Sequence, residues 1–406
     1  MTQFPKDFLW GAATSAYQVE GQNPHCDWWE WEKRMGLKDL SGLACRHYEF
    51  FKEDFALASQ LKHNAHRLSI EWSRIEPEEG KFDAKQVDHY SHVLSCLRDL
   101  HLEPIVTLHH FTNPLWFSRK GGWLSHAAVE DFLRYVRFIT QALGPQVKFW
   151  MTINEPQVYL YHGFVSGAWP PQEKSLFKAN QAQENLINAH IKAYRAINEI
   201  YRAKNLPSPK ISFANHMQCF VPCVPSLRNK LAVKIRDRLF NFGFLERLLK
   251  HKTLDFIGIN YYSRSVVELH GWWPGRFFTD TCNQNHHPLQ KNSLGWDIYP
   301  QGLYDLLIKL KRYDLPIVIT ENGICTEDDN LRWEFIRGHL KSISLALEQN
   351  VKVGGYLYWS LIDNFEWDKG FTPRFGLIEV NYQTYARTIR ESAWKFSQVC
   401  QNGKLE

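Results

Sequence analysis

The sequence lacks the features that mark a multidomain or membrane-spanning chain. Its 406 residues contain no Pro/Gly/Ser-rich stretch, no block of like charge and no low-complexity tract that would separate domains. No window reaches the roughly 18 uncharged apolar residues that a membrane span needs. The N-terminus has no basic region followed by an apolar one, as a secretory signal would. We therefore expect one domain over residues 1–406, a cytoplasmic location and no membrane partner.

Cysteine is present but follows no pattern, and neither sign of charge dominates. The eight cysteines include no CxxC pair, and no histidine pair stands at zinc-finger spacing. This scatter predicts reduced, mostly buried thiols and no metal site. The net charge is only +5, with the densest basic stretch at residues 228–252. A nucleic-acid or membrane face is one interpretation of that stretch. We favour the solvated side of an amphipathic helix, since no recognition motif accompanies it, and expect no nucleic-acid partner.

What the sequence does contain is an eightfold alternation of apolar, strand-like runs with helical periodicity. The runs cover residues 8–13, 65–72, 104–110, 149–154, 210–216, 255–261, 316–320 and 353–359. The helical stretches cover residues 48–61, 87–100, 129–143, 182–203, 228–252, 302–313, 332–348 and 388–399. Nearly continuous apolar runs are typical of buried parallel strands. The pattern predicts an α/β fold, a single-domain (β/α)₈ TIM barrel with its active site at the C-terminal ends of the strands.

Polar residues gather where these strands are predicted to end. They are Arg67, Glu71, His109, His110, Asn154, Glu155, Asn260, Tyr261, Tyr262, Glu321 and Trp359. Because the strand ends of such a barrel meet at one rim, their concentration there indicates a site.

Two short motifs place a glutamate at a strand end: TINEP at residues 152–156 and ITENG at 319–323. Strands four and seven lie across a small barrel from each other, and paired carboxyls about 5–5.5 Å apart are the equipment of a retaining glycosidase. Arg67 and Tyr262 are candidates to keep Glu321 ionised, which makes it the predicted nucleophile. The charge on Glu321 would then raise the pKa of Glu155, the predicted acid/base.

At this point the chain resembles family 1 glycoside hydrolases, the β-glucosidase and β-galactosidase family, almost from end to end. Besides the two glutamate motifs, the resemblance rests on FLWGAATSAYQVEG (8–21), HRLSIEWSR (66–74), TLHH (107–110), FIGINYY (256–262), YWSLIDNFEW (358–367) and RFGL (374–377). It implies a retaining mechanism through a covalent glycosyl-enzyme, without metal or organic cofactor. Glu321 matches the family nucleophile and Glu155 the acid/base, with Arg67 and Tyr262 supporting the nucleophile. The implied substrate-binding residues are Gln18, His110, Asn154, Asn260, Trp359, Glu366, Trp367 and Phe375.

The resemblance implies a small β-glycoside or oligosaccharide as the substrate, and it also indicates whether the sugar is phosphorylated. Family members that act on 6-phosphorylated sugars usually carry a small-residue version of the Glu366 loop, and a carboxylate there would repel a phosphate dianion. We therefore expect an exo-acting enzyme on unphosphorylated β-glucosides, β-galactosides or β-fucosides. A 6-phospho-β-glycosidase, a transglycosylase and an inactive sugar-binding barrel remain as alternatives. The oligomeric state is open.

The sequence departs from the family pattern at Phe111, at Gln157 and in residues 238–254, which look shortened. These changes leave the reaction class standing and open the question of leaving-group preference. Asn215 and His216 could each fill a family asparagine position near the substrate, and Asn215 matches in residue type.

Overall fold

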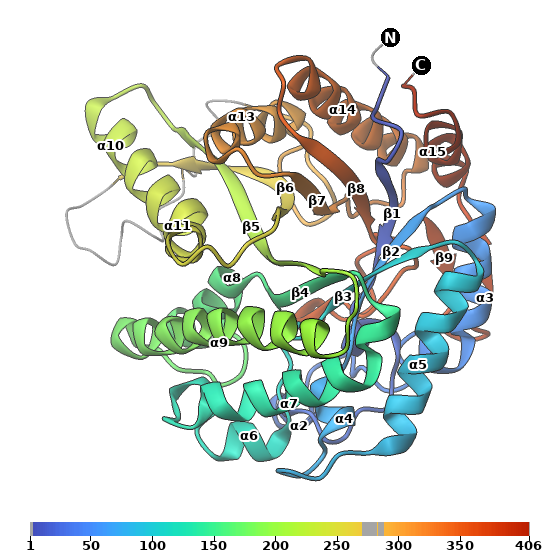
Figure 1. Cartoon of the computed structure of the whole chain (residues 1–406). Helices are drawn as coiled ribbons and strands as arrows, with labels where there is room; N and C mark the ends of the chain where they lie inside the picture. Colours follow the sequence, from blue (N-terminus) through green and yellow to red (C-terminus); the bar gives the residue numbers. More distant parts are fainter. Residues whose placement is uncertain (1–2, 270–281, 283–287, 406) are drawn as a thin grey trace.

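Eight parallel strands close into a barrel in strict sequence order, β1 to β8, in the computed structural model, which describes residues 3–269, 282 and 288–405 (Figure 1). The strands are β1 Leu9–Ala13, β2 Ala65–Ser69, β3 Glu103–Thr107, β4 Phe149–Asn154, β5 Lys210–Pro222, β6 Ile257–Val267, β7 Ile317–Asn322 and β8 Val353–Trp359. The predicted TIM barrel is therefore confirmed. A small antiparallel pair, β9 Ile378–Val380 with β10 Arg387–Ile389, lies outside it.

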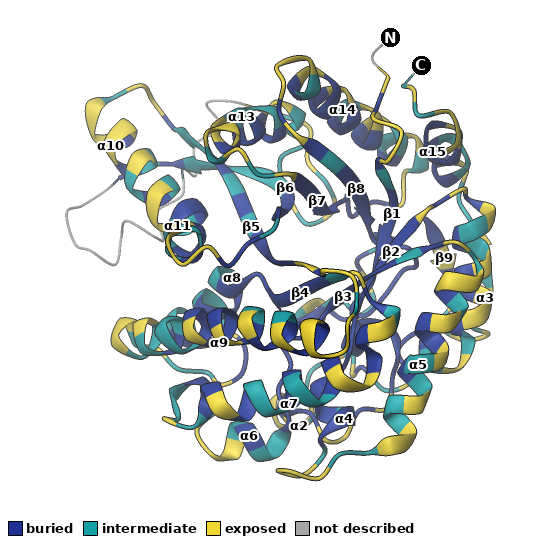
Figure 2. Cartoon of the chain, in the orientation of Figure 1, coloured by how far each residue is buried: buried dark blue, intermediate teal, exposed yellow. Residues whose placement is uncertain are grey.

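Helices surround the barrel with their apolar sides turned inward, as the burial colours show (Figure 2). The longer ones are α2 Asp27–Met35, α3 His47–Gln60, α5 Ala84–Asp99, α7 Ala128–Leu143, α9 Leu176–Ala203, α10 Leu227–Arg236, α11 Gly243–Lys250, α13 Pro300–Leu310, α14 Asp329–Glu348 and α15 Glu391–Asn402. The short ones are α1 Ala16–Val19, α4 Trp72–Ile75, α6 Leu115–Arg119 and α8 Pro156–Leu160. Asp83, Ser175 and Asp328 cap α5, α9 and α14 by accepting hydrogen bonds from first-turn amides. Within the described chain, no helix is long and apolar enough to cross a membrane.

The period-two alternation of the strands builds the barrel interior in layers. The lower layer is a separate apolar cluster of Ala65, Ile105, Met151, Ala214, Phe256, Val318 and Leu357, with Leu9 and Phe149 packed against it. Gly258 must lack a side chain here, because a Cβ would come within 2.6 Å of Met151 Cε and 2.7 Å of the Phe213 carbonyl oxygen. Two residues further along β2, β3, β5 and β7, the same direction is taken by the polar side chains of Arg67, Thr107, His216 and Thr320, so this part of the interior changes from apolar to polar at the C-terminal rim.

Strands β5 and β6 run beyond the ends that the sequence predicts at 216 and 261. They stay paired out to Pro222 and Val267, with one register shift between Met217 and Cys219. The extra pairing places residues from both strands above the rim, next to the predicted site. The apolar runs end earlier because the extension is only half buried, so hydrophobicity did not reveal it.

The basic stretch is not the single amphipathic helix that we expected. A π-helical segment, Asp237–Phe242, separates α10 from α11. In α11 the prediction holds, since Leu245 and Leu248 are buried. In α10 it is wrong, since Leu231 is 45% exposed while Arg236 is buried.

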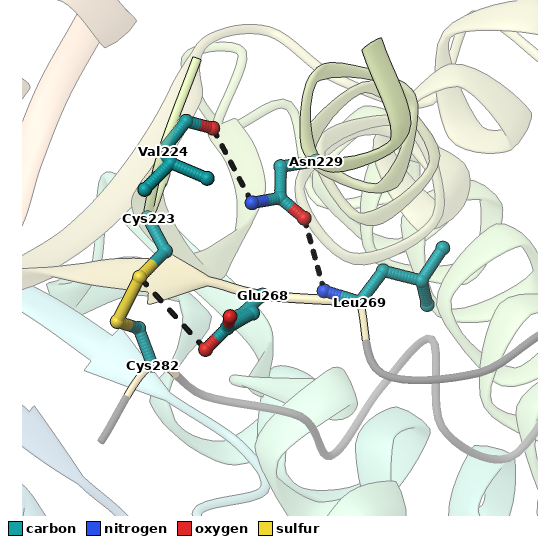
Figure 3. Close-up of a disulfide and its surroundings, with 6 residues drawn as sticks. All are labelled: Cys223, Val224, Asn229, Glu268, Leu269 and Cys282. Carbon is teal, nitrogen blue, oxygen red and sulfur yellow. Dashed lines mark hydrogen bonds between the residues drawn. A yellow bond between two sulfur atoms is a disulfide. The ribbon is translucent and has the colours of Figure 1, made fainter. Parts of the chain in front are cut away.

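The expectation that all cysteines are reduced is also wrong for one pair. Cys223 and Cys282 form a disulfide, with their Cα atoms 5.8 Å apart (Figure 3). Asn229 braces the same region, because its amide donates to the Val224 carbonyl oxygen and its Oδ1 accepts from the Leu269 amide. The two cysteines are 59 residues apart in sequence, so spacing alone could not pair them. The other six are free thiols, and five of them are buried.

Candidate active site

Arg67 organises the polar layer at the C-terminal rim of the barrel. It is 1% exposed and lies on β2, two residues after the inward-facing Ala65. Its guanidinium donates through Nε to Thr107 Oγ1 at 3.1 Å and through Nη2 to Asn154 Oδ1 at 2.7 Å. Nη1 pairs with Glu321 Oε1. One buried cation thus connects strands β2, β3, β4 and β7.

Glu321 accepts from two donors in the way predicted for the nucleophile. Oε1 accepts from Arg67, and Oε2 accepts from the Tyr262 hydroxyl at 2.6 Å. Its side chain is only 5% exposed. A register shift in the β6–β7 pairing sets Glu321 opposite Asn260, which turns the carboxyl towards the interior of the rim.

Glu155 follows β4 directly, with a left-handed backbone conformation at φ 41°. Its amide donates to the Ala214 carbonyl oxygen at 2.8 Å. Its Oε1 accepts from Asn260 Nδ2 at 2.8 Å and lies 3.1 Å from His216 Nδ1. Asn260 Nδ2 also donates to Asn154 Oδ1 at 3.1 Å. Because Asn154 is held by Arg67 as well, a continuous hydrogen-bonded path joins the two glutamates.

The pKa order of the two carboxyls is the reverse of the sequence-based expectation. Burial raises the pKa of Glu321 to about 7; Arg67 and Tyr262 oppose this rise, and the charge on Glu155 adds to it. Burial also raises the pKa of Glu155, but His216, Asn260 and Arg67 outweigh it and hold that pKa below its usual value. The expectation considered Glu321 as the only charge near Glu155, and it omitted the donors that only the fold brings there.

A third carboxyl group, Glu366, lies on the loop after β8 and is held by Gln18. Gln18 Nε2 donates to Glu366 Oε2 at 3.2 Å and to Asn364 Oδ1 at 3.0 Å, while Ser15 fixes the other end of the Gln18 amide. Burial and the charge on Glu321 raise the pKa of Glu366 to about 8. Near neutral pH this group is therefore mostly protonated, so its repulsion of a phosphate becomes complete only in alkaline solution.

Aromatic rings complete the surroundings of this rim. His110 is stacked near both Trp359 and Trp367, with ring centroids 6.2 Å apart in each case. His110 Nε2 also lies 3.0 Å from Asn154 Nδ2. Phe375 packs with Trp359 in one cluster. Indole faces beside hydrogen-bonding groups suit a sugar, which has an apolar ring face and polar edges.

The structure does not bring every polar strand-end residue to this rim. His109 bonds Asn113 at 3.0 Å, and Glu71 accepts from Ser73 and Thr112 in a buried cluster of its own. Asn215 is fully buried and donates to the Asn241 carbonyl oxygen, so of the two alternatives it is His216 that lies beside Glu155. Strand alternation could have shown this, since His216 shares the inward direction of Ala214.

Sequence reasoning missed Trp296, which lies beside two residues of the predicted site. Trp296 is 39% exposed, and its ring lies 5.8 Å from that of Tyr262 and 6.3 Å from that of Phe375. Among the departures from the family pattern, Phe111 packs against Trp367, one of the predicted sugar-binding residues, with ring centroids 5.2 Å apart.

Comparison with known proteins decides the family. The model described as "Glycosyl hydrolase family 1" matches residues 1–250 and 245–405. The chain belongs to glycosyl hydrolase family 1. The family match is split at residues 245–250, inside the segment 238–254 that looks shortened in sequence.

Relatives in this family cover the whole chain. β-Glucosidase A of Thermotoga maritima is 31% identical, over 100% of this chain and 99% of its own length. A 6-phospho-β-galactosidase of Clostridium acetobutylicum is 30% identical, over 100% and 98%. Among solved structures, a β-glycosidase from Pyrococcus horikoshii superposes with a TM-score of 0.92 at 38% identity, covering 100% of this chain and 97% of that one. This member of the family is therefore a hydrolase of glycosidic bonds.

Proposed function

We propose that the chain, as one catalytic domain over residues 1–406, is a retaining exo-β-glycosidase that acts on unphosphorylated β-glucosides, β-galactosides or β-fucosides. The observation that carries the proposal is the pair of differently supported carboxyls. Glu321 accepts from a cation and a phenol, and Glu155 from an amide and an imidazole. Two carboxyls in different environments are what acid and nucleophile roles require.

In the proposed reaction Glu321 attacks the anomeric carbon while Glu155 protonates the departing oxygen. Glu155 then takes a proton from water, which releases the sugar with its original configuration. The productive form has the shared proton on Glu155 and none on Glu321, so substrate binding has to reverse the pKa order of the two carboxyls in the free enzyme. Arg67 and Tyr262 favour this form, because both donate to the Glu321 carboxylate. The reaction uses only these side chains and water, with no cofactor or metal.

Gln18, His110, Asn154, Glu366 and Trp367 are proposed to grip the sugar hydroxyls. Gln18 donates to Glu366, Asn154 lies within hydrogen-bonding distance of His110, and the His110 ring is stacked near that of Trp367, which supports the proposal. Trp359 and Phe375 supply apolar walls.

Azide rescue tests the nucleophile. Glu321→Ala should lose hydrolysis of 4-nitrophenyl β-glucoside by at least about 10³-fold, and azide should restore turnover as the α-glycosyl azide. Glu199→Ala, an exposed glutamate on α9, is the matched control and should behave as the unaltered enzyme. Rescue with a β-configured product would contradict a nucleophilic Glu321.

A leaving-group series tests the acid. Glu155→Ala should retain far more activity on 2,4-dinitrophenyl β-glucoside than on 4-methylphenyl β-glucoside, because a good leaving group departs without a proton. Equal losses on the two substrates would remove Glu155 from the acid role.

A 6-phospho-β-glycosidase is the second candidate, because a relative of that name is 30% identical to this chain. Comparing kcat/KM for 4-nitrophenyl β-glucoside with and without a 6-phosphate separates the two. We expect the unphosphorylated substrate to be preferred, and a strong preference for the phosphate would establish the second candidate instead.

We propose the cytoplasm as the compartment. The Cys223–Cys282 disulfide is unusual for that location, because cytosolic thiols are generally kept reduced. Fractionation of the source cells should recover the glycosidase activity together with a cytosolic marker enzyme, and recovery in a secreted or periplasmic fraction would contradict the proposal.

A further inference from the structure

His216 occupies a position on β5 from which it reaches the acid/base carboxyl. It follows the inward-facing Ala214 by two residues and pairs with Asn260 in the β5–β6 register. Its side chain is 13% exposed, and Nδ1 lies 3.1 Å from Glu155 Oε1. An imidazole and a carboxyl with so little contact with water interact more strongly than the same pair would at the surface.

Contacts on the other side of the ring define how His216 meets Glu155. Gln218 Nε2 lies 3.4 Å from His216 Nε2, so the amide N–H points at that nitrogen and leaves the proton on Nδ1. Nδ1–H then donates to Glu155. The ring is stacked beside Tyr262 at 6.1 Å and meets Phe240 edge-on at 5.8 Å, which restricts its orientation.

The two carboxyl oxygens of Glu155 differ in their contacts, because both donors approach the same oxygen. Asn260 Nδ2 and His216 Nδ1 both approach Oε1. Oε2 makes no hydrogen bond within the described part of the chain, so it is the oxygen available to a leaving group or a water molecule. Two donors on one oxygen therefore orient the carboxyl and also stabilise its ionised form.

We propose that His216 is a positioning residue for Glu155, which holds Oε1 through Nδ1–H and stabilises the carboxylate that accepts a proton from water in the second step. The inference rests on the proposed function, because it assigns His216 a part in that reaction. The inference concerns both steps of the reaction. By stabilising the Glu155 carboxylate, His216 assists Glu155 as a base in the second step and disfavours the protonated acid that the first step needs.

Several charged or titratable groups surround Glu155 besides His216, and each contributes to its protonation. They are Arg67 from β2, His162 from the segment Tyr161–Val165, Tyr262 from β6, Glu321 from β7 and Glu366 from the loop after β8. A pH profile is therefore compared between variants that differ only at His216, so that these contributions stay constant.

The test is the pH dependence of kcat/KM on 4-nitrophenyl β-glucoside. Its basic limb reports loss of the last proton shared by the two glutamates. His216→Phe removes a hydrogen bond to a charged group, so the basic limb should move to higher pH by about one unit. On 2,4-dinitrophenyl β-glucoside, where the base step limits turnover, the acid limb of kcat should move upward as well. His216→Asn, which restores a short donor, should bring both limbs most of the way back.

Controls separate this inference from the function on which it rests. His251→Ala removes an exposed imidazole after α11 and should leave the profile unchanged. An unaltered enzyme without glycosidase activity would overturn the proposed function. The inference alone would be overturned by a different result in an active enzyme. In that result, Glu155→Gln abolishes the basic limb of the pH profile of kcat/KM, but His216→Phe leaves the limb at its original pH. If His216→Phe does not fold, Gln218→Leu should still raise the basic limb, by part of a unit, and an unmoved limb there would also contradict the inference.

Discussion

Arg67 offers the sharpest test of how this site works, because it is a buried cation with four polar contacts. Besides Glu321, Asn154 and Thr107, it donates to the Thr320 carbonyl oxygen. Arg67→Met keeps much of the apolar stem and removes the charge and all of these donors. The consequences for the nucleophile and for the fold are separate and can be measured separately.

Glu321, the proposed nucleophile, should become harder to ionise in this variant. Arg67 opposes the rise in the Glu321 pKa that burial causes. A hydrogen bond to a charged group contributes about 1.5–3 kcal/mol, which corresponds to about one to two pH units. The acid limb of kcat/KM should therefore move to higher pH by that amount. At pH 6 the variant should lose about 10- to 100-fold in kcat/KM from this cause alone.

The fold should lose about 3–5 kcal/mol of unfolding free energy, measured in urea, because one partner of a buried ion pair remains without the other. Arg74→Met is a matched control. Arg74 pairs with Glu20 at 2.8 Å, and both side chains are nearly as buried, at 11% and 6% exposure. That variant should lose comparable stability and keep the acid limb in place. An unmoved limb in Arg67→Met, or an equal movement in Arg74→Met, would refute the assignment of Arg67 to the nucleophile.

Three further expectations concern charge and covalent structure. Burial raises the pKa of Glu71 from its usual value to about 7, so its contribution to stability is complete below about pH 4.5 and is lost as pH rises through 7. Between pH 4.5 and pH 8, the free energy of unfolding of Glu71→Gln, measured in urea, should therefore rise by about 3 kcal/mol relative to that of the unaltered protein. The same pH dependence in both proteins would contradict this expectation. Because the pKa of Glu366 is raised to about 8, selectivity for 4-nitrophenyl β-glucoside over its 6-phosphate should increase about tenfold from pH 6.5 to pH 9 and should stay flat in Glu366→Gln. Oxidised protein should lose about 4 kcal/mol on reduction of Cys223–Cys282, whose loop spans 59 residues; Cys223→Ser should show no response to reductant.

The sequence by itself determined the features that depend on local patterns. Eight apolar runs separated by helical periods are sufficient for a closed barrel, because each run must be buried on both faces. Glu155 and Glu321 follow the fourth and seventh apolar runs, so the same pattern puts them at strand ends. They share one rim because the strands of such a barrel all end there. These inferences need only distances of a few residues along the chain.

The tertiary structure alone decided which side chains meet at that rim and what they do to one another. Arg67 reaches Glu321 across 254 residues of sequence, and Asn260 reaches Glu155 across 105. A register shift in the β6–β7 pairing sets Glu321 opposite Asn260. The pKa order of the two glutamates and the Cys223–Cys282 bond depend on such long-range placement. Protonation and covalent pairing respond to groups within a few ångströms in space, and a linear pattern contains no such distances.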